Sequence, residues 1–100
     1  MKKKLFVDDV RIPVDIYPDT DMGDWLSART YETAIYLLET EDIELISLDH
    51  DLGADKSGYD LCKWMSANNR WPQYVQIHSM NPVGRINMLR EYEFYLKHSK

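Results

Sequence analysis

The sequence has little cysteine and no long hydrophobic run. Cys62 is the only cysteine among the 100 residues, which excludes an intramolecular disulfide and a cysteine-based zinc site. The lysines at positions 2–4 are followed by only three apolar residues before Asp8, too few for a signal peptide. No apolar run approaches the length of a transmembrane helix. We therefore expect a cytoplasmic protein that does not bind membranes.

Positive charge is also scarce, because 12 lysines and arginines face 17 aspartates and glutamates, for a formal net charge of −5. An acidic surface disfavours duplex nucleic acid and anionic membranes as partners. It leaves room for a small anionic ligand in one locally positive pocket. The apolar content of 44% is ordinary for a globular protein, and 100 residues suffice for one domain with a small core. We expect a single domain over residues 1–100.

Short apolar segments bounded by polar residues predict the strands. The central one, residues 43–48, is apolar on both alternating faces, which is typical of a parallel strand covered on both sides. The four predicted strands are residues 3–7, 25–29, 43–48 and 74–77. A short fifth strand within residues 93–97 is a further possibility, although a helix fits that segment better.

Apolar residues at helical spacing predict three helices, over residues 31–40, from about 57 to 68, and from Pro82 onward. Thr30, Ser57 and Asn81 are suitable N-caps. The predicted buried face of the last helix consists of Val83, Ile86, Leu89, Tyr92, Tyr95 and Leu96. Residues 10–24 contain two prolines and several β-branched residues, which favour a long loop with at most one short turn in place of a first helix.

Alternating strands and helices predict an α/β fold with a parallel sheet and right-handed crossovers. In a doubly wound sheet of order 2-1-3-4, the first and third strands are neighbours and the fourth lies beside the third. Polar residues follow each of these three strands: Asp8 and Asp9, Asp49 to Asp51, and His78 with Ser79. Ligands of such sheets bind at the carboxyl ends of the strands, so we expect the functional site at this edge.

Three carboxylates, those of Asp8, Asp9 and Asp49, are expected to converge there. Clustered carboxylates repel one another, so one must stay protonated or a cation must bind. Oxygen ligands of this kind suit Mg²⁺ or Mn²⁺. The alternative is a hydrogen-bonded acidic pocket without a metal.

Two histidines, His50 and His78, follow neighbouring strands. Imidazole titrates near neutrality, so one histidine can deprotonate water while the other protonates a leaving oxygen. The alternatives are metal ligation or a structural hydrogen bond to a carboxylate.

The start of the last helix has the composition of an anion site. Backbone N–H groups of a first helical turn favour phosphate, and an arginine can contact it in bidentate fashion. The candidates for phosphate binding are Arg11, Ser79, Asn81, Gly84 and Arg85. The alternatives are a capped helix with an exposed Arg85, and an Arg11 that pairs with Asp15.

These residues carry a resemblance. The Asp8-Asp9 pair, Asp49 and Ser79 resemble the acidic pair, the phosphoacceptor and the hydroxyl of two-component receiver domains. The chain departs from that pattern in its missing first helix and in the absence of a final strand with its lysine. The segments Asp8–Arg11, Leu48–Gly53 and His78–Gly84 are more similar to the cyclic-phosphate processing receiver-like family, and this similarity covers nearly the whole chain.

The resemblance implies a three-layer, receiver-like (flavodoxin-like) fold with a reduced sheet of four strands. It implies a metal-assisted phosphodiesterase that acts on cyclic phosphates of nucleotide or ADP-ribose derivatives. Asp49, His50 and His78 would be catalytic, and the backbone carbonyl of Asp51 would join Asp8, Asp9 and Asp49 around the cation. Two alternatives remain open: a receiver phosphorylated on Asp49, and a non-catalytic module that binds a nucleotide signal or a protein partner.

Overall fold

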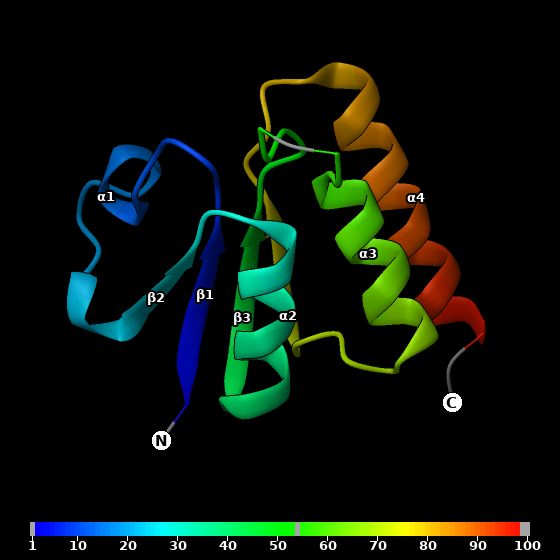
Figure 1. The fold of residues 1–100 in the computed structure, drawn as a ribbon, viewed down its shortest axis with the longest axis horizontal. Helices are drawn as coiled ribbons and strands as arrows, with labels where there is room; N and C mark the ends of the chain where they lie inside the picture. The colour runs from blue at the N-terminus through cyan, green and yellow to red at the C-terminus, as the bar shows by residue number, and fades with distance from the viewer. Residues whose placement is uncertain (1, 54, 99–100) are drawn as a thin grey trace.

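A computed structural model of the chain describes residues 2–53 and 55–98. Figure 1 shows the arrangement of its helices and strands. In chain order the elements are β1 (Lys3–Val7), α1 (Pro13–Ile16), a 3₁₀ turn (Met22–Asp24), β2 (Trp25–Ala28), α2 (Tyr31–Thr40), β3 (Ile43–Leu48), α3 (Gly58–Ala67), β4 (Tyr74–Ile77) and α4 (Pro82–His98).

The four strands form one parallel sheet of order β2-β1-β3-β4, as predicted. The last residues of the strands are in register, because Val7 pairs with Ala28 and Leu48, and Leu48 pairs with Ile77. The four residues that follow the strands therefore lie in one row at the carboxyl edge. This register brings the three predicted polar strand tips together.

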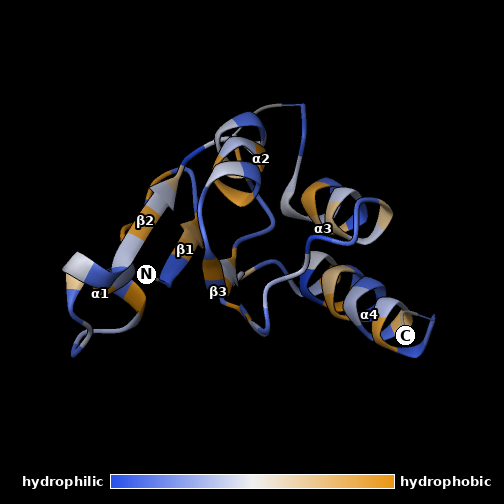
Figure 2. Cartoon of the chain, turned by 90° about the horizontal axis from the view of Figure 1, so that it is seen from below, coloured by the Kyte–Doolittle hydropathy of each residue, from blue (hydrophilic) through white to orange (hydrophobic). Residues whose placement is uncertain are grey.

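One face of the sheet forms the hydrophobic core. Leu5 and Val7 of β1 and Ile46 and Leu48 of β3 are fully buried there against apolar residues of α2 and α3. Figure 2 shows α2 and α3 on this side of the strands, while α4 lies beside α3 beyond β3. The alternate residues of the strands, among them Phe6 and Ser47, face the opposite side, where α1 lies.

Residues 10–24 contain two short helical segments, α1 and the 3₁₀ turn, where we predicted a loop with at most one turn. Pro13 occupies the first position of α1, and the Asp15 carboxylate accepts a hydrogen bond from the Ile12 N–H at 2.9 Å. A proline at the first position and a carboxylate in the first turn both stabilise a helix start. Four residues nevertheless make only one turn, so α1 is a remnant of a helix in a segment that is otherwise mostly loop, close to the prediction.

The last helix differs from its prediction in the face that it buries. Val83, Ile86, Leu89 and Leu96 are about half exposed or more, and the fully buried residues of α4 are Gly84 and Met88. The helix continues to His98, so residues 93–97 are helical and form no fifth strand. Among the described residues, no helix combines the length and the apolar character that crossing a bilayer requires.

Candidate metal and phosphate site at the carboxyl edge of the sheet

Three carboxylates converge after β1 and β3. One oxygen from each of Asp8, Asp9 and Asp49 lies within 4.8 Å of the other two. Asp8 and Asp49 are almost completely buried, with exposed fractions of 1% and 5%, whereas Asp9 is partly exposed. The predicted acidic cluster is therefore present in the structure.

Backbone contacts hold Asp9 beside the other two carboxylates. Its carbonyl accepts a hydrogen bond from Arg29 Nη1 at 2.9 Å. Gly53 packs against its side chain with a φ of +69°, and a Cβ at this glycine would lie 2.8 Å from Asp9 Oδ2. Only glycine adopts that backbone conformation at no steric cost, so Gly53 allows the loop after β3 to close against Asp9.

Asp8 accepts hydrogen bonds on both of its oxygens. Oδ1 accepts the backbone N–H groups of Val10 and Arg11 at 2.9 and 2.8 Å, and Oδ2 accepts Arg11 Nε at 2.8 Å. Burial raises the pKa of Asp8, but these hydrogen bonds and the one from His78 outweigh burial and lower the pKa below its ordinary value. Asp8 is therefore ionised at neutral pH, as a cation ligand must be.

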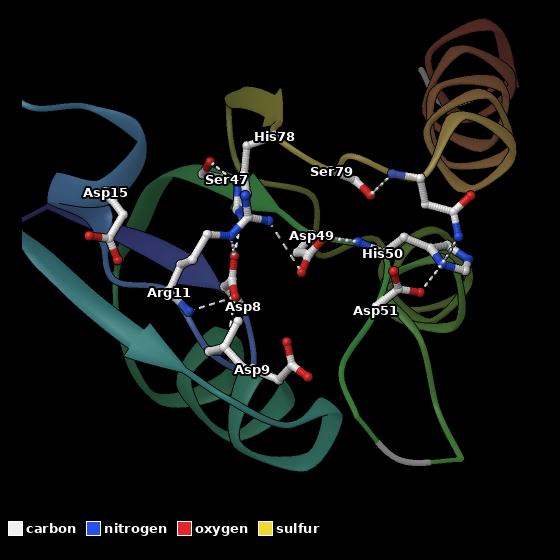
Figure 3. A network of polar contacts seen from close by, with 12 residues as sticks. Asp8, Asp9, Arg11, Asp15, Ser47, Asp49, His50, Asp51, His78 and Ser79 are labelled. Carbon is white, nitrogen blue, oxygen red and sulfur yellow. Dashed lines mark hydrogen bonds and ion pairs between the residues drawn. The ribbon is translucent and has the colours of Figure 1, made fainter.

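Arg11 bridges two of the three carboxylates. Its Nη2 lies 3.5 Å from Asp49 Oδ2, in addition to the contact with Asp8, and Figure 3 shows its side chain directed into the cluster. The alternative pairing with Asp15 does not occur, because that carboxylate is bonded to Ile12 in α1. The Arg11 guanidinium thus already neutralises part of the negative charge of the carboxylates, as a bound cation would.

His78 is buried beneath the cluster and hydrogen-bonded through both ring nitrogens. Nε2 lies 3.0 Å from Asp8 Oδ2, Nδ1 lies 2.7 Å from Ser47 Oγ, and the ring stacks on Phe6 with centroids 4.5 Å apart. Because an ionised carboxylate can only accept, Nε2 carries the proton and Nδ1 accepts from the serine. Burial lowers the pKa of His78, against the raising effect of Asp8, so the imidazole is neutral at pH 7.

Ser47 and Tyr17 also belong to this site, although neither was among the predicted site residues. Tyr17 Oη lies 2.7 Å from Ser47 Oγ, and the Tyr17 ring stacks on Trp25 at 5.7 Å. Ser47 lies in β3 two residues before Asp49, which directly follows the strand, so extended-chain periodicity places both side chains on one face of the sheet. The two-residue spacing from Asp49 could therefore have identified Ser47 as a site residue. No comparable pattern in residues 10–24 points to Tyr17.

His50 lies at the outer side of the same edge, against the start of α4. Its Nδ1 is 3.1 Å from Asp51 Oδ1 and 3.4 Å from Asn81 Nδ2 (Figure 3). A Cβ on Gly84 would lie 2.3 Å from Cγ of the His50 ring, so Gly84 makes room for this histidine. The Asp51 side chain is exposed and lies outside the carboxylate cluster; a cation contact by its backbone carbonyl stays a prediction.

The first turn of α4 is organised by its own polar residues. Ser79 Oγ accepts the Asn81 N–H at 3.1 Å, and Asn81 Oδ1 accepts the Gly84 N–H at 3.0 Å, so Asn81 caps the helix as predicted. Arg85 Nη1 donates to the Ile77 carbonyl at 3.1 Å. Arg85 also lines an apolar groove between β4 and α4. The phosphate contacts expected of these residues stay predictions.

The donor set fits a hard divalent cation. Three carboxylate oxygens within 4.8 Å of one another are the ligands that Mg²⁺ and Mn²⁺ take, and Mg²⁺ commonly binds through one or two carboxylates plus water and substrate phosphates. Asp8, Asp9 and Asp49 would hold such an ion.

The parallel order β2-β1-β3-β4 and the acidic carboxyl edge define a receiver fold. Two solved structures share it over nearly their whole length. The MaeR response regulator bound to beryllium trifluoride aligns with a TM-score of 0.63 and 20% identity, over 97% of this chain and 95% of that one. The signal receiver domain of a putative Luxo repressor protein from Vibrio parahaemolyticus aligns with a TM-score of 0.56 and 18% identity, over 98% of both chains.

At the level of sequence, residues 3–93 match the cyclic-phosphate processing receiver domain, and the chain belongs to that family. No curated protein matches it. The resemblance and the fold class inferred from the sequence are thus confirmed.

Proposed function

We propose that this protein is a metal-assisted phosphodiesterase that opens a cyclic phosphate on a nucleotide or ADP-ribose derivative. One observation carries the proposal: three carboxylates, an arginine and a histidine meet at the carboxyl edge of the sheet in a chain of the cyclic-phosphate processing receiver family. A divalent cation bound by Asp8, Asp9 and Asp49 would supply Lewis acidity and neutralise charge at the phosphate. The ligand is a small phosphorylated molecule.

Arg11 is the residue best placed to contact the phosphate. Its guanidinium is about a quarter exposed and lies against Asp8 and Asp49. Arg11 would compete with a cation for the same carboxylate oxygens, so its guanidinium would give up at least one of these contacts. Its N–H groups would then be free to donate to the non-bridging oxygens, where negative charge builds up in the transition state.

In this proposal His50 transfers the proton as the general acid or base. Its side chain is 21% exposed, and its backbone N–H donates to Asp49 Oδ1 at 2.9 Å. Asp51 and Gly84 fix its ring at the outer side of the edge. His78 has a separate task in this proposal, because its two nitrogens are already bonded to Asp8 and Ser47.

The test is phosphorus NMR on a panel of 2′,3′-cyclic nucleotides, 3′,5′-cyclic nucleotides and cyclic-phosphate ADP-ribose, with Mg²⁺ or Mn²⁺ present. We expect conversion of at least one cyclic diester to a monoester. Asp49→Asn should abolish it, and His50→Ala should lower the rate by about 10²- to 10⁴-fold, the usual contribution of a general acid or base. His98→Ala is the matched control, since His98 lies near the end of α4, where it contacts the carbonyl and the ring of Phe94.

A non-catalytic binding module is the second candidate. Arg11 already pairs with two of the three carboxylates. Its positive charge reduces their mutual repulsion, which a scaffold without a metal requires. Tight binding without ring opening across the panel would favour a module that sequesters a nucleotide signal. Neither binding nor turnover would favour a scaffold for a protein partner.

A further inference from the structure

A chain of hydrogen bonds runs from the loop to the carboxylate cluster across the buried face of the sheet. Tyr17 Oη lies 2.7 Å from Ser47 Oγ, Ser47 Oγ lies 2.7 Å from His78 Nδ1, and His78 Nε2 lies 3.0 Å from Asp8 Oδ2. Ser47 is fully buried. Figure 3 shows the inner part of this chain, from Ser47 to Asp8.

We propose that Tyr17, Ser47 and His78 form a positioning relay, which holds Asp8 in the orientation that it needs as a cation ligand. The inference rests on the proposed cation site and adds three residues to it, none of which touches the ion or the substrate.

The relay acts by fixing the orientation of the His78 ring. A neutral imidazole has one N–H and one lone pair. Because Nε2 faces the ionised Asp8 carboxylate, it carries the proton, and Nδ1 accepts from the Ser47 hydroxyl. This second hydrogen bond prevents the ring from turning its N–H away from Asp8. Ser47 Oγ in turn accepts from the Tyr17 hydroxyl, which keeps the serine proton directed toward the histidine.

The surroundings of His78 keep its N–H on Asp8 when a cation disrupts the ion pair between Arg11 and Asp8. The His78 ring lies parallel to Phe6, at an interplanar angle of 1°, and both of its nitrogens are anchored. Arg11, the other side-chain donor to Asp8 Oδ2, is a quarter exposed and competes with a cation for that oxygen. The His78 N–H is therefore the donor that remains on Asp8 Oδ2 after the cation binds, while the backbone N–H groups of Val10 and Arg11 still hold Oδ1. Carboxylate ligands are commonly fixed by such outer contacts, whose loss costs about 10- to 100-fold in metal affinity or activity.

The experiment measures Mn²⁺ affinity by calorimetry across a series of variants of the whole chain. His78→Phe keeps the stack on Phe6 and removes the donor, so affinity should fall by about 10- to 100-fold. His78→Gln keeps an N–H that can reach Asp8, and it should recover much of that loss. Ser47→Ala should weaken binding by about 3- to 10-fold, and Tyr17→Phe, which keeps the stacking on Trp25, by less.

Two controls separate positioning from general stability. Tyr95→Phe removes a tyrosine hydroxyl that bonds to Asn69 at the far end of α4, so it should change the melting temperature without changing Mn²⁺ affinity. ¹⁵N NMR of the His78 ring, recorded without metal, should show the proton on Nε2 in the wild type. In Ser47→Ala the proton should stay on Nε2, because Asp8 still accepts it, and the Nδ1 resonance should shift downfield because Nδ1 has lost its hydrogen bond.

The outcomes are distinguishable. If the wild type binds no Mn²⁺, both the cation site and the relay are refuted. If the wild type binds and folded His78→Phe, or Ser47→Ala, binds equally well, the cation site stands and the relay alone is refuted. A Ser47→Ala spectrum with an unshifted Nδ1 resonance also refutes the relay.

Discussion

Replacing Arg11 by glutamine should strengthen cation binding while it weakens catalysis. The guanidinium contacts Asp8 at 2.8 Å and Asp49 at 3.5 Å. A divalent ion on the same oxygens would lie about 5 Å from it, where a single and a double positive charge repel by about 1.5 kcal/mol in water and about 6.5 kcal/mol at an effective dielectric constant of 20. Because the Arg11 side chain is 26% exposed, the lower part of this range applies.

A repulsion of about 1.5 to 3 kcal/mol corresponds to about 10- to 100-fold in affinity. Calorimetric titration with Mn²⁺ at low ionic strength should therefore show a dissociation constant lower by that factor in Arg11→Gln. The difference should shrink as salt is added, since salt screens partly exposed charges. The ring-opening rate should fall in the same variant, because the phosphate loses its guanidinium contact.

Without metal, the same variant should be less stable than the wild type. The buried Asp8 carboxylate loses a charged donor, which costs about 1 to 3 kcal/mol for a partly exposed pair. Thermal unfolding in EDTA measures this loss, and added Mn²⁺ should then raise the melting temperature more than it does in the wild type.

Arg90→Gln is the matched control. It removes the same charge from an exposed residue of α4 that is not part of the carboxylate cluster, so Mn²⁺ affinity should change by no more than about threefold. If Arg11→Gln binds Mn²⁺ as weakly as the wild type or more weakly, the guanidinium is not a competitor of the cation and the argument fails.

Three further predictions follow from the same geometry. Gly84→Ala should displace the His50 ring, whose Cγ would lie 2.3 Å from the new Cβ, and it should lower the ring-opening rate nearly as much as His50→Ala; an unchanged rate would contradict this. Acetyl phosphate should leave no stable adduct on Asp49, since among residues 2–53 and 55–98 no strand follows β4 to bring a lysine to the site, and a phosphoryl mass gain lost in Asp49→Asn would overturn this. Burial lowers the pKa of His78 from 6.5, so the unfolded chain binds more protons below that pH. The stability of the metal-free protein should therefore fall as the pH drops below about 6.5, and His78→Gln should flatten the slope; an equal slope in both proteins would refute it.

The strands and their polar tips were predictable because both depend on local pattern. Short apolar segments identified all four strands, and the abrupt change to polar residues after Leu48 identified Asp49 at the end of β3. Parallel topology then placed Asp8 beside Asp49, because the carboxyl ends of parallel strands meet at one edge. The acidic cluster was predictable from connectivity alone.

The buried face of α4 was not predictable, because the helix carries apolar residues on more than one side. Periodicity favoured the stripe that starts at Val83, whereas packing buries Gly84 and Met88. Small residues decide the outcome. Gly84 lies against His50, and Gly58 of α3 lies so close to Met88 that a Cβ would be 3.0 Å from its sulfur. Close approach of two helices depends on three-dimensional fit, which a one-dimensional pattern does not contain.

The hydrogen-bond partners of Arg11 and His78 could not be predicted from the sequence. Arg11 had two plausible roles and His78 had three, and the choice depends on which partner lies within reach after folding. Arg11 contacts Asp8 and not Asp15. The Asp15 carboxylate instead accepts a hydrogen bond from the Ile12 N–H at the start of α1. A one-turn helix thus decides the charge balance of the site.

The remnant of the first helix therefore has a consequence for function. Residues 10–24 supply Arg11, which contacts two of the clustered carboxylates, and Tyr17, which begins the hydrogen-bond chain to Asp8. A regular helix over this segment would space the two residues by about 9 Å along its axis. The short α1 instead lets Arg11 reach the carboxyl edge and Tyr17 lie over Ser47 near the end of β3. The segment that departs most from a complete receiver fold thus supplies both the proposed competitor of the cation and the first residue of the proposed relay.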